Sequence, residues 1–448
     1  MIYNKRKKGK EGNILKKKRY VEVGLGNRAR FFYSSIAKNF NETSEIVAFC
    51  DINKTRMEYA NKLLVEKYGY DKPVKLYMSD EFDKMIEEQK PDYVIVTTID
   101  RTHHKYIVRA MELGCDVISE KPMTMDEVKC NEILDAIERT GRNLRVTFNY
   151  RYAPHNSKIR ELIMNDTIGK VTQVHFEWML NTKHGADYFR RWHRDKRNSG
   201  GLMVHKSTHH FDLVNFWLGT YPETVYAQGG LKFYGRENAE ERGITKFYNR
   251  AHGSEYAKDD PFALHMEGNE WFENAFLKAE HEDGYLRDQS VFGDNISIED
   301  TMNVLVTYNS GAVLTYALNA YSPIEGFNVS FTGTKGRIEM NVVEKVYVSG
   351  SGSSSAEGAT ASKKLMVYPM FAEAYEVEVE EGEGGHGGGD NVLREDIFGT
   401  PSNDPLNRAA SHVDGVSSII TGICANKSMA SGMPVKVEDV LGRKIKDL

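Results

Sequence analysis

The segment Ser119–Pro122 (SEKP) places a lysine, Lys121, directly after a short apolar run at 116–119. Pro122 has no N–H and cannot continue a strand's hydrogen-bond ladder, so Lys121 is expected at the carboxyl end of that strand. In open α/β sheets this edge is where ligands bind. A Glu-Lys-Pro sequence taken alone is more typical of a solvated turn. A catalytic role for Lys121 therefore depends on what the rest of the chain places around it.

The segment 200–218 carries a second group of side chains that could exchange protons. If it is helical from His205, then His205, His209 and Asp212 share one face, because side chains three and four apart are neighbours. His209 could be a general base that Asp212 orients. Two histidines four apart could instead bind a metal, and a solvated polar face is a third interpretation. We favour the base and predict no metal site, because no glutamate completes a zinc-protease arrangement.

A glycine turn near the N-terminus has the pattern of a dinucleotide-binding loop. An apolar run at 19–24 leads into Gly-x-Gly-x-x-Ala, and a helical pattern follows to about residue 40. The first glycine allows a tight turn, the second lets the backbone approach a pyrophosphate, and the following helix offers free N–H groups. The cofactor-binding residues predicted in this turn are Gly24, Gly26, Asn27 and Arg28.

The residue that follows the next apolar run, 45–50, is acidic. Asp51 has the spacing from the glycines that suits a hydrogen bond to the adenosine ribose, and its charge would repel a 2′-phosphate. We therefore predict NAD as the cofactor, and Arg56, one turn further on, keeps NADP as the less favoured alternative. The structural interpretation of Asp51 is an N-cap for a helix at 54–68.

Apolar runs alternate with helical patterns over the first third of the chain, which predicts a doubly wound parallel sheet at 19–150. Beyond it, strand-like alternation and two hairpin signals predict a second α/β domain at 151–448, with a large, mainly antiparallel open sheet. The fold class is therefore α/β, a Rossmann dinucleotide-binding domain followed by an open-sheet domain. The expected strands lie at 91–98, 116–119, 143–149, 171–180, 302–309, 312–319, 327–332 and 337–340.

The composition describes a globular chain of two or three domains, with 448 residues, 40% hydrophobic and 27% charged side chains, and a net charge of −5. This charge predicts no nucleic-acid partner, and no run approaches the ~20 apolar residues of a membrane span. Four cysteines without paired spacing fit buried thiols of a cytoplasmic protein. Four segments show no clear periodicity. We predict a basic, disordered tail at 1–18 and a flexible Gly/Ser/Ala-rich loop at 349–362, and we make no assignment for 236–288. The glycine-rich run at 380–390 is either a linker or a ligand contact.

With these residues identified, the chain from about Arg19 onward resembles the Gfo/Idh/MocA family, which includes glucose–fructose oxidoreductase and inositol dehydrogenase. The resemblance implies that Lys121 lies beside the nicotinamide and hydrogen-bonds the reacting hydroxyl, while His209 exchanges its proton. It also implies cofactor-binding roles for Thr98, His103, Glu120 and Asn149. The motifs that carry it are GLGNRA at 24–29, Thr98–His103, Glu120–Pro122, Asn149–Tyr152, and Gly200–Gly201 leading to His209-x-x-Asp212.

One position departs from the inositol dehydrogenase pattern, which has Asp four residues before the histidine, where this chain has His205. The surrounding run, with 189–193 and 386–390, resembles a subgroup that acts on glycosides or keto-sugars. Its NAD-dependent glycosidases oxidise the sugar transiently and eliminate the aglycone, which makes His205 a further catalytic acid–base group. The substrate-binding residues that we predict are Tyr152, Arg191, Trp192, His193 and Asp390.

These features predict a cytoplasmic NAD-dependent oxidoreductase that acts on a secondary alcohol of a sugar or glycoside. The alternative is a redox-assisted glycosidase or lyase that keeps NAD bound and proceeds through a 3-keto intermediate. A non-catalytic NAD-binding sensor is disfavoured because Lys121 and His209 are both present. The free face of the open sheet predicts a homodimer or homotetramer.

Overall fold

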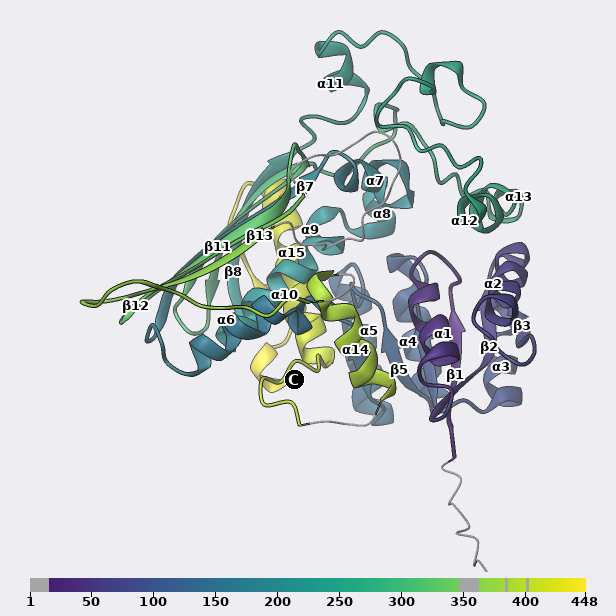
Figure 1. Cartoon of the computed structure of the whole chain (residues 1–448), viewed down its shortest axis with the longest axis horizontal. Coiled ribbons are helices and arrows are strands. Elements are labelled where there is room, and N and C mark those ends of the chain that lie inside the picture. The colour runs from purple at the N-terminus through teal and green to yellow at the C-terminus, as the bar shows by residue number, and fades with distance from the viewer. Residues whose placement is uncertain (1–15, 346–361, 383–385, 400–402) are drawn as a thin grey trace, which may run out of the picture.

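The structure is a computed structural model that describes residues 16–345, 362–382, 386–399 and 403–448. Residues 1–15 of the predicted basic tail and 349–361 of the predicted loop lie outside this part of the chain. Figure 1 shows a parallel sheet with its helices beside a larger, strongly twisted sheet. Within the described residues, no helix is both long and apolar enough to cross a membrane.

The first sheet has six parallel strands in the order β3-β2-β1-β4-β5-β6, which confirms the doubly wound prediction. Its central strand β4 is the apolar sequence YVIV, as expected where helices cover both faces. The strand order reverses between β1 and β4, so their carboxyl ends flank a crevice where ligands bind. The strands are β1 Lys18–Val23, β2 Ser44–Asp51, β3 Lys75–Met78, β4 Tyr93–Val96, β5 Asp116–Ser119 and β6 Leu144–Val146.

Five helices connect these strands, and the last strand is shorter than predicted. It ends at Val146, and Asn149–Tyr152 forms the 3₁₀ turn η3 in place of further strand. The first helix begins at the glycine turn and places its N-terminus at the crevice, as the motif predicts. The helices are α1 Ala29–Lys38, α2 Lys54–Glu66, α3 Phe82–Gln89, α4 His103–Glu112 and α5 Glu127–Thr140, with the 3₁₀ turns η1 Ser79–Glu81 and η2 Asp100–Thr102.

The second sheet has nine strands in the order β14-β13-β12-β11-β7-β10-β9-β8-β15. Both predicted hairpins form, β9 with β10 and β11 with β12, and only β7 and β10 pair in parallel. From Met302 to Tyr308, side chains of β9 alternate between buried and exposed, so one face of the sheet is open. The strands are β7 Val171–Asn181, β8 Pro222–Gly230, β9 Thr301–Tyr308, β10 Val313–Ser322, β11 Glu325–Gly333, β12 Gly336–Lys345, β13 Ser362–Pro369, β14 Tyr375–Glu376 and β15 Val435–Lys436.

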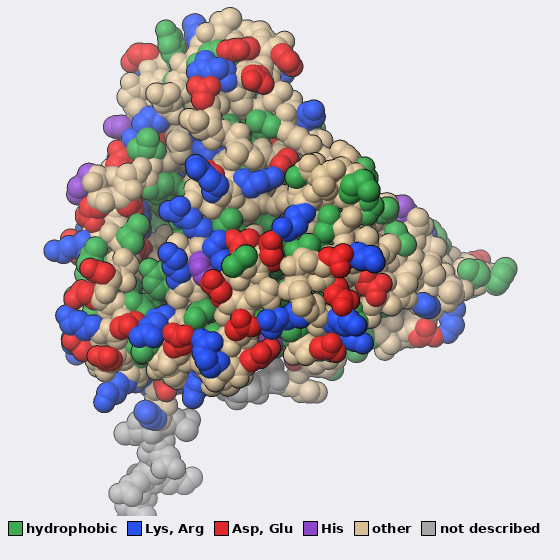
Figure 2. Space-filling view, turned by 180° about the vertical axis from the view of Figure 1, so that it is seen from behind, with side chains coloured by type: hydrophobic (Ala, Val, Ile, Leu, Met, Phe, Trp, Pro, Cys, Tyr) green, Lys and Arg blue, Asp and Glu red, His purple; other side chains and the backbone are tan. Residues whose placement is uncertain are grey.

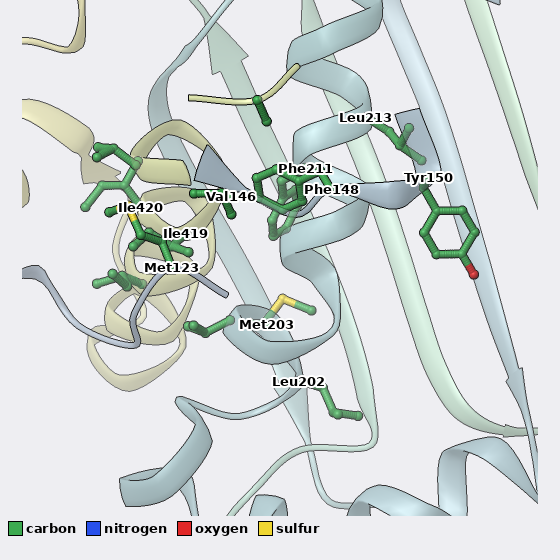
Figure 3. Packing of buried hydrophobic residues seen from close by; sticks show 14 of the residues in the cluster. Met123, Val146, Phe148, Tyr150, Leu202, Met203, Phe211, Leu213, Ile419 and Ile420 are labelled. Carbon is green, nitrogen blue, oxygen red and sulfur yellow. The ribbon is translucent and has the colours of Figure 1, made fainter. Parts of the chain in front are cut away.

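Helices on the covered face join the two sheets through one continuous core. Figure 3 shows Met123, which follows the SEKP segment, near Met203 of α9 and Ile419 of α15. Met123 and Met203 are fully buried, so the SEKP loop and the histidine-bearing helices are fixed on the same apolar core. The helices of this region are α6 Pro154–Met164, α7 His184–Arg190, η4 Trp192–Arg194, α8 Lys196–Ser199, α9 Leu202–His205, α10 Ser207–Leu218, α15 His412–Ser431, α16 Val437–Leu441 and η8 Ile445–Asp447.

Two later segments return to the first sheet. The helix α14 (Gly389–Phe398), after the turn η7 (His386–Gly388), places Phe398 edge-on against Tyr20 of β1. The stretch between β8 and β9, which has no clear period in the sequence, leaves the second sheet and reaches α2 (Figure 1). We call residues 231–300 the insert; its short helices are α11 Arg236–Glu241, η5 Glu255–Ala257, α12 Glu270–Phe272, η6 Glu273–Leu277 and α13 Glu280–Asp283.

The surface carries both signs of charge. Figure 2 shows Lys and Arg side chains lying among Asp and Glu over much of the rear face. This mixture agrees with the small net charge of −5.

Candidate active site

The glycine turn between β1 and α1 has the geometry that a dinucleotide requires. Gly24 has a φ of +88°, and a Cβ there would lie 2.6 Å from the Thr98 backbone, so only glycine fits. A Cβ at Gly26 would meet nothing within 4 Å, which leaves open space beside the backbone for a phosphate. Asn27 is exposed at the turn and Ala29 is fully buried against the sheet. These residues fit the pyrophosphate of a dinucleotide.

Asp51 at the end of β2 holds this turn in place. Its carboxylate accepts the Leu25 N–H, and the Asn53 N–H at 3.0 Å. The N-cap of α2 is Asn53, whose Oδ1 accepts the Arg56 N–H at 2.9 Å, so the N-cap interpretation of Asp51 is wrong. Burial raises the pKa of Asp51, against the effect of Arg56, whose guanidinium lies 3.6 Å away. Asp51 thus lies where the ribose of a bound dinucleotide is expected.

The insert docks on this end of the site. Arg56 donates to Asp283 at 2.9 Å and to the Ala275 carbonyl at 3.0 Å, and Asn53 Nδ2 donates to the Ala279 carbonyl at 2.8 Å. Trp271 adds a cation–π contact, with the Arg30 guanidinium 4.5 Å from its ring centroid. A segment of the second domain therefore covers the helix that follows Asp51.

A network of charged and polar side chains joins four segments that are distant in the sequence, at the other end of the cofactor crevice. Arg28 Nε donates to Glu120 at 2.7 Å, and its Nη2 lies 3.5 Å from Asp390. Asn149 Nδ2 donates to Asp390 at 2.7 Å, and His386 Nδ1 lies 3.1 Å from the same carboxylate. Burial raises the pKa of Asp390, but His386 and Arg28 outweigh it and hold that pKa well below its usual range. Asp390 was predicted to bind substrate; it lies instead with the predicted cofactor-binding residues.

Lys121 extends from β5 toward the second domain. Its Nζ donates to the backbone carbonyl of His205 at 3.2 Å, and its own N–H donates to the Glu120 carboxylate at 3.1 Å. The Lys121–Pro122 peptide is cis. The lysine that the SEKP segment predicts at a strand end therefore reaches the histidine-bearing helices.

The two histidines of the predicted stripe have different surroundings. His205 ends α9 and His209 lies in the first turn of α10, with a break at Lys206 where the His209 N–H bonds a carbonyl three residues back. A single helix from His205 was therefore the wrong prediction. The side chains on each side of the break also have different partners: His210 and Ser207 bond Tyr316 of β10, while His205 Nδ1 lies 2.6 Å from Asp100.

Asp212 does not orient His209, contrary to the sequence prediction. Its carboxylate accepts two hydrogen bonds from Arg151, at 2.8 and 2.5 Å, and Arg151 also pairs with Asp414 at 2.8 Å. His209 Nδ1 is buried without a hydrogen-bond partner among the described residues. Burial lowers the pKa of His209, and Lys121 and Lys206 lower it further, so the ring is neutral near pH 7. A neutral imidazole is ready to accept a proton.

Three of the predicted substrate-binding residues surround His205. The Trp192 ring stacks on His193 with centroids 3.5 Å apart, and the His193 ring lies 4.1 Å from that of His205. Arg191 pairs with Asp187 at 3.0 Å and lies over the Tyr188 ring. These groups form an aromatic and cationic wall next to Lys121.

Two predicted site residues have structural partners instead. Tyr152 is 3% exposed and donates its hydroxyl to Asp396, in a network with Arg145, so it does not face the substrate region. His103 is 1% exposed, with Nδ1 2.8 Å from the Pro122 carbonyl and Nε2 3.0 Å from the Thr98 carbonyl. Burial lowers its pKa, so the neutral ring donates to one of these carbonyls and links the loops after β4 and β5.

Three residues at the site were not recognised from the sequence. Asp100 begins the turn η2 in the loop after β4, four residues beyond Val96, and an acid in the loop at the carboxyl end of a buried strand is a signal that sequence reasoning could have used. Arg151 gave no such signal, because its partner Asp212 is 61 residues away. His386 lies in the run 386–390 that carries the subgroup resemblance, but only Asp390 of this run was assigned a site role. Among the residues that the structure describes, no three His, Cys, Asp or Glu side chains come together as metal ligands.

Comparison with protein families decides what kind of protein carries this site. The model of the oxidoreductase family's NAD-binding Rossmann fold matches residues 18–148, and that of its C-terminal alpha/beta domain matches residues 160–437. The chain belongs to the Gfo/Idh/MocA oxidoreductase family. It is therefore an oxidoreductase with an NAD-binding domain, as its motifs predict.

Individual relatives agree with the family. The chain is 36% identical over 445 residues to "Putative oxidoreductase YteT" of Bacillus subtilis (strain 168), covering 94% of this chain and 98% of that protein. It is 23% identical to D-glucoside 3-dehydrogenase of Escherichia coli (strain K12), over 69% of this chain and 80% of that one. The structure of the WlbA dehydrogenase from Bordetella pertussis with NADH and UDP-GlcNAcA shares the fold, with a TM-score of 0.61, 16% identity, and coverage of 94% and 98%.

Proposed function

We propose that this oxidoreductase transfers hydride between NAD and a secondary alcohol of a sugar or glycoside. The observation that carries the proposal is the position of Lys121, at the end of a Rossmann strand and 3.2 Å from the backbone of His205 in the second domain. The Gfo/Idh/MocA relatives named for D-glucoside and inositol dehydrogenases support a sugar substrate. The aromatic wall of Trp192 and His193 offers a surface of the kind that packs on a sugar ring.

The side chains of the site have distinct tasks in this reaction. Bound NAD would supply the hydride acceptor. The Lys121 ammonium donates a hydrogen bond to the substrate oxygen and stabilises negative charge as that oxygen loses its proton. His209, neutral because it is buried, accepts the proton. Glu120 and Asn149, fixed through Arg28 and Asp390, hold the shape of the pocket for the nicotinamide end.

NAD is the proposed cofactor, and NADP is the alternative. A 2′-phosphate would have to lie next to Asp51, and the cation that could receive it, Arg56, already pairs with Asp51 and Asp283. Both carboxylates would repel the phosphate. Acid release of the dinucleotide that co-purifies with the protein, followed by mass spectrometry, tests this choice, and recovery of NADP alone would contradict it.

A substrate panel tests the proposed reaction. The holoenzyme is mixed with free sugars and aryl glycosides while the absorbance of reduced nicotinamide and of released aglycone are followed together. We expect reduced nicotinamide to form with at least one sugar or glycoside. No reduction with any of them, by protein shown to contain the dinucleotide, would overturn the proposal.

A second candidate, a redox-assisted glycosidase or lyase, is favoured by the insert. This reaction needs NAD to stay bound, and the contacts of Asp283 and Trp271 with the first domain close over the helix after Asp51. Release of aglycone without net reduced nicotinamide would select this candidate. We expect Asp283→Ala to speed dissociation of the dinucleotide, because Arg56 and Asn53 both lose a partner, while the exposed Asp71→Ala leaves dissociation unchanged.

We also propose that the open face of the second sheet joins two or more copies of the chain. The face contains a hollow of about 560 Å³ lined by strands of the sheet, including Glu177, Asn328 and Arg337. Light scattering after size-exclusion chromatography tests for a dimer or tetramer. Asn328→Arg, in the middle of this face, is expected to give monomers, and a monomeric unmodified protein would contradict the proposal.

A further inference from the structure

We propose that Glu282 and Asp283 of the insert exclude NADP, because their carboxylates take up the groups of the loop after Asp51 that would bind its 2′-phosphate. The inference rests on the proposed function, in which NAD is the cofactor, and it names the residues that enforce this choice. Both acids belong to α13 of the second domain, although the helix that they contact, α2, belongs to the first. The control of cofactor choice therefore lies outside the Rossmann domain.

The loop after Asp51 contains two features that suit a 2′-phosphate. The first is the N-terminus of α2, where the N–H groups of Lys54 and Thr55 have no acceptor within the helix. The second is Arg56, whose guanidinium lies 3.6 Å from Asp51. By residue type alone, Asp51 argues against NADP and these two features argue for it.

Glu282 occupies the helix N-terminus in the way that a bound anion would. Its carboxylate accepts the N–H of Lys54 and, at 3.1 Å, the N–H of Thr55, and it also accepts the Thr55 hydroxyl. Desolvation raises the pKa of Glu282, but the hydrogen bonds from Thr55 and Lys54 outweigh it and lower that pKa. The group is therefore a carboxylate near pH 7, with a negative charge and oxygen acceptors like those of a phosphate.

Asp283 pairs with the cation of the same loop. Arg56 Nη2 donates to Asp283 Oδ2 at 2.9 Å, and Asn53 Nδ2 donates to the same oxygen at 3.1 Å. Arg56 is 7% exposed, and its Nε donates to the Ala275 carbonyl of the insert at 3.0 Å. The guanidinium thus has an acid on each side, Asp51 and Asp283, and it cannot turn toward a third anion without losing one of them.

The rest of the insert holds the two acids in place. Asp283 Oδ1 accepts the N–H of Tyr285 at 3.0 Å, and Arg287, a little further along the chain, forms an ion pair with Asp187 of α7 at 2.8 Å. On the other side of the acids, Phe276 packs in an apolar cluster with side chains of α2. A phosphate could therefore take the place of the acids only if several of these contacts broke.

The balance of charge at this loop shows why the insert, rather than Asp51 alone, decides between the cofactors. Asp51 carries one negative charge, against one positive charge on Arg56 and a helix N-terminus equivalent to about half a positive charge. The loop by itself is thus slightly positive and would attract a phosphate. Glu282 and Asp283 add two negative charges and make it negative. NAD has a neutral hydroxyl in place of the phosphate, so it does not meet this repulsion.

A competition measurement tests the two acids without any substrate. The holoenzyme is equilibrated with equal concentrations of NAD and NADP, free dinucleotide is removed by gel filtration, and the bound dinucleotides are released by acid and quantified by mass spectrometry. We expect the double variant Glu282→Gln/Asp283→Asn to lower the ratio of bound NAD to bound NADP by about 30-fold, because two charges that repel the phosphate are removed. The exposed Asp259→Asn, an acid elsewhere in the insert, should leave the ratio unchanged.

The sign of the charge separates repulsion of the phosphate from simple loosening of the insert. Glu282→Lys should favour NADP more than Glu282→Gln does, because both variants weaken the contact with α2 but only the first adds a cation. If the acids merely held the insert against α2, their loss would speed the release of both dinucleotides and leave the ratio unchanged, which overturns the proposal. Where the double variant does not fold, Glu282→Gln and Asp283→Asn are measured singly, and an unchanged ratio in both is equally decisive.

The outcomes separate this inference from the proposed function. If the unmodified protein and the variants all retain NAD at the same ratio, the inference fails and NAD remains the cofactor. If the unmodified protein retains NADP, the choice of NAD fails and takes the inference with it, while the substrate panel still tests hydride transfer. If Asp51→Ser alone, with both insert acids present, shifts the ratio as far as the double variant does, the control lies in the Rossmann domain and the inference is overturned.

Discussion

The regions around His205 and His209 lie four residues apart and differ in how each imidazole is held. His205 has a buried carboxylate from the other domain at Nδ1, whereas His209 packs against the Tyr150 ring, 5.0 Å away, with its Nδ1 unbonded among the described residues. The carboxylate one turn after His209 is bonded to Arg151. Spacing along a helix therefore does not identify the group that orients a catalytic base.

The largest expected effect comes from His209. His209→Gln should lower the single-turnover rate of nicotinamide reduction about 10²–10⁴-fold, because the alcohol proton loses its acceptor. Stopped-flow absorbance on the holoenzyme measures this rate, and the exposed His265→Gln should leave it unchanged. A larger loss of the same rate in His205→Gln than in His209→Gln would reverse the assignment of the two histidines.

The ion pair between Asp212 and Arg151 is expected to contribute to the free energy of unfolding. Asp212→Asn should lower the free energy of unfolding by about 3–5 kcal/mol, because Arg151 is buried and loses a partner that accepts two of its hydrogen bonds. Urea denaturation measures this change. An unchanged free energy of unfolding together with a fall in kcat would revive the interpretation in which Asp212 orients His209.

A smaller effect, on the pH dependence of stability, is expected for His155, a buried imidazole that has no carboxylate partner of the kind that His205 has. Burial, with a contribution from Lys363, lowers the pKa of His155 to about 3. The unfolded chain, with a histidine pKa near 6.5, binds one more proton between about pH 6.5 and 3. The free energy of unfolding should therefore decrease as the pH is lowered through this window, and this residue alone contributes about 1.4 kcal/mol per pH unit.

His155→Gln should remove that part of the slope. Urea denaturation at pH 7 and pH 5, for the variant and the unmodified protein, measures it, and catalysis near pH 7 is expected to be unaffected. Equal slopes in the two proteins would mean that His155 is protonated in the folded state.

Much of the fold could be predicted because its signals are local. The apolar strand YVIV, the Gly24 turn and the proline after Lys121 each specify backbone geometry within a few residues. The sixth strand was predicted too long, since Asn149 enters a 3₁₀ turn that packs against α14, a helix more than 200 residues later. The helices of the insert could not be predicted, because its sequence has no hydrophobic periodicity. These short helices are held by contacts with α2 rather than by a repeating apolar face.

The parallel sheet, the dinucleotide turn, the place of Lys121 at a strand end and the presence of two nearby histidines could be read from the chain alone, because each follows from residue type and short-range spacing. Which acid pairs with which base depends on packing between distant segments. The Asp100–His205 contact joins residues 105 apart, and the Arg151–Asp212 contact joins residues 61 apart. Such pairs form when packing brings buried charges together, since a charge removed from water must find its partner wherever the fold places one.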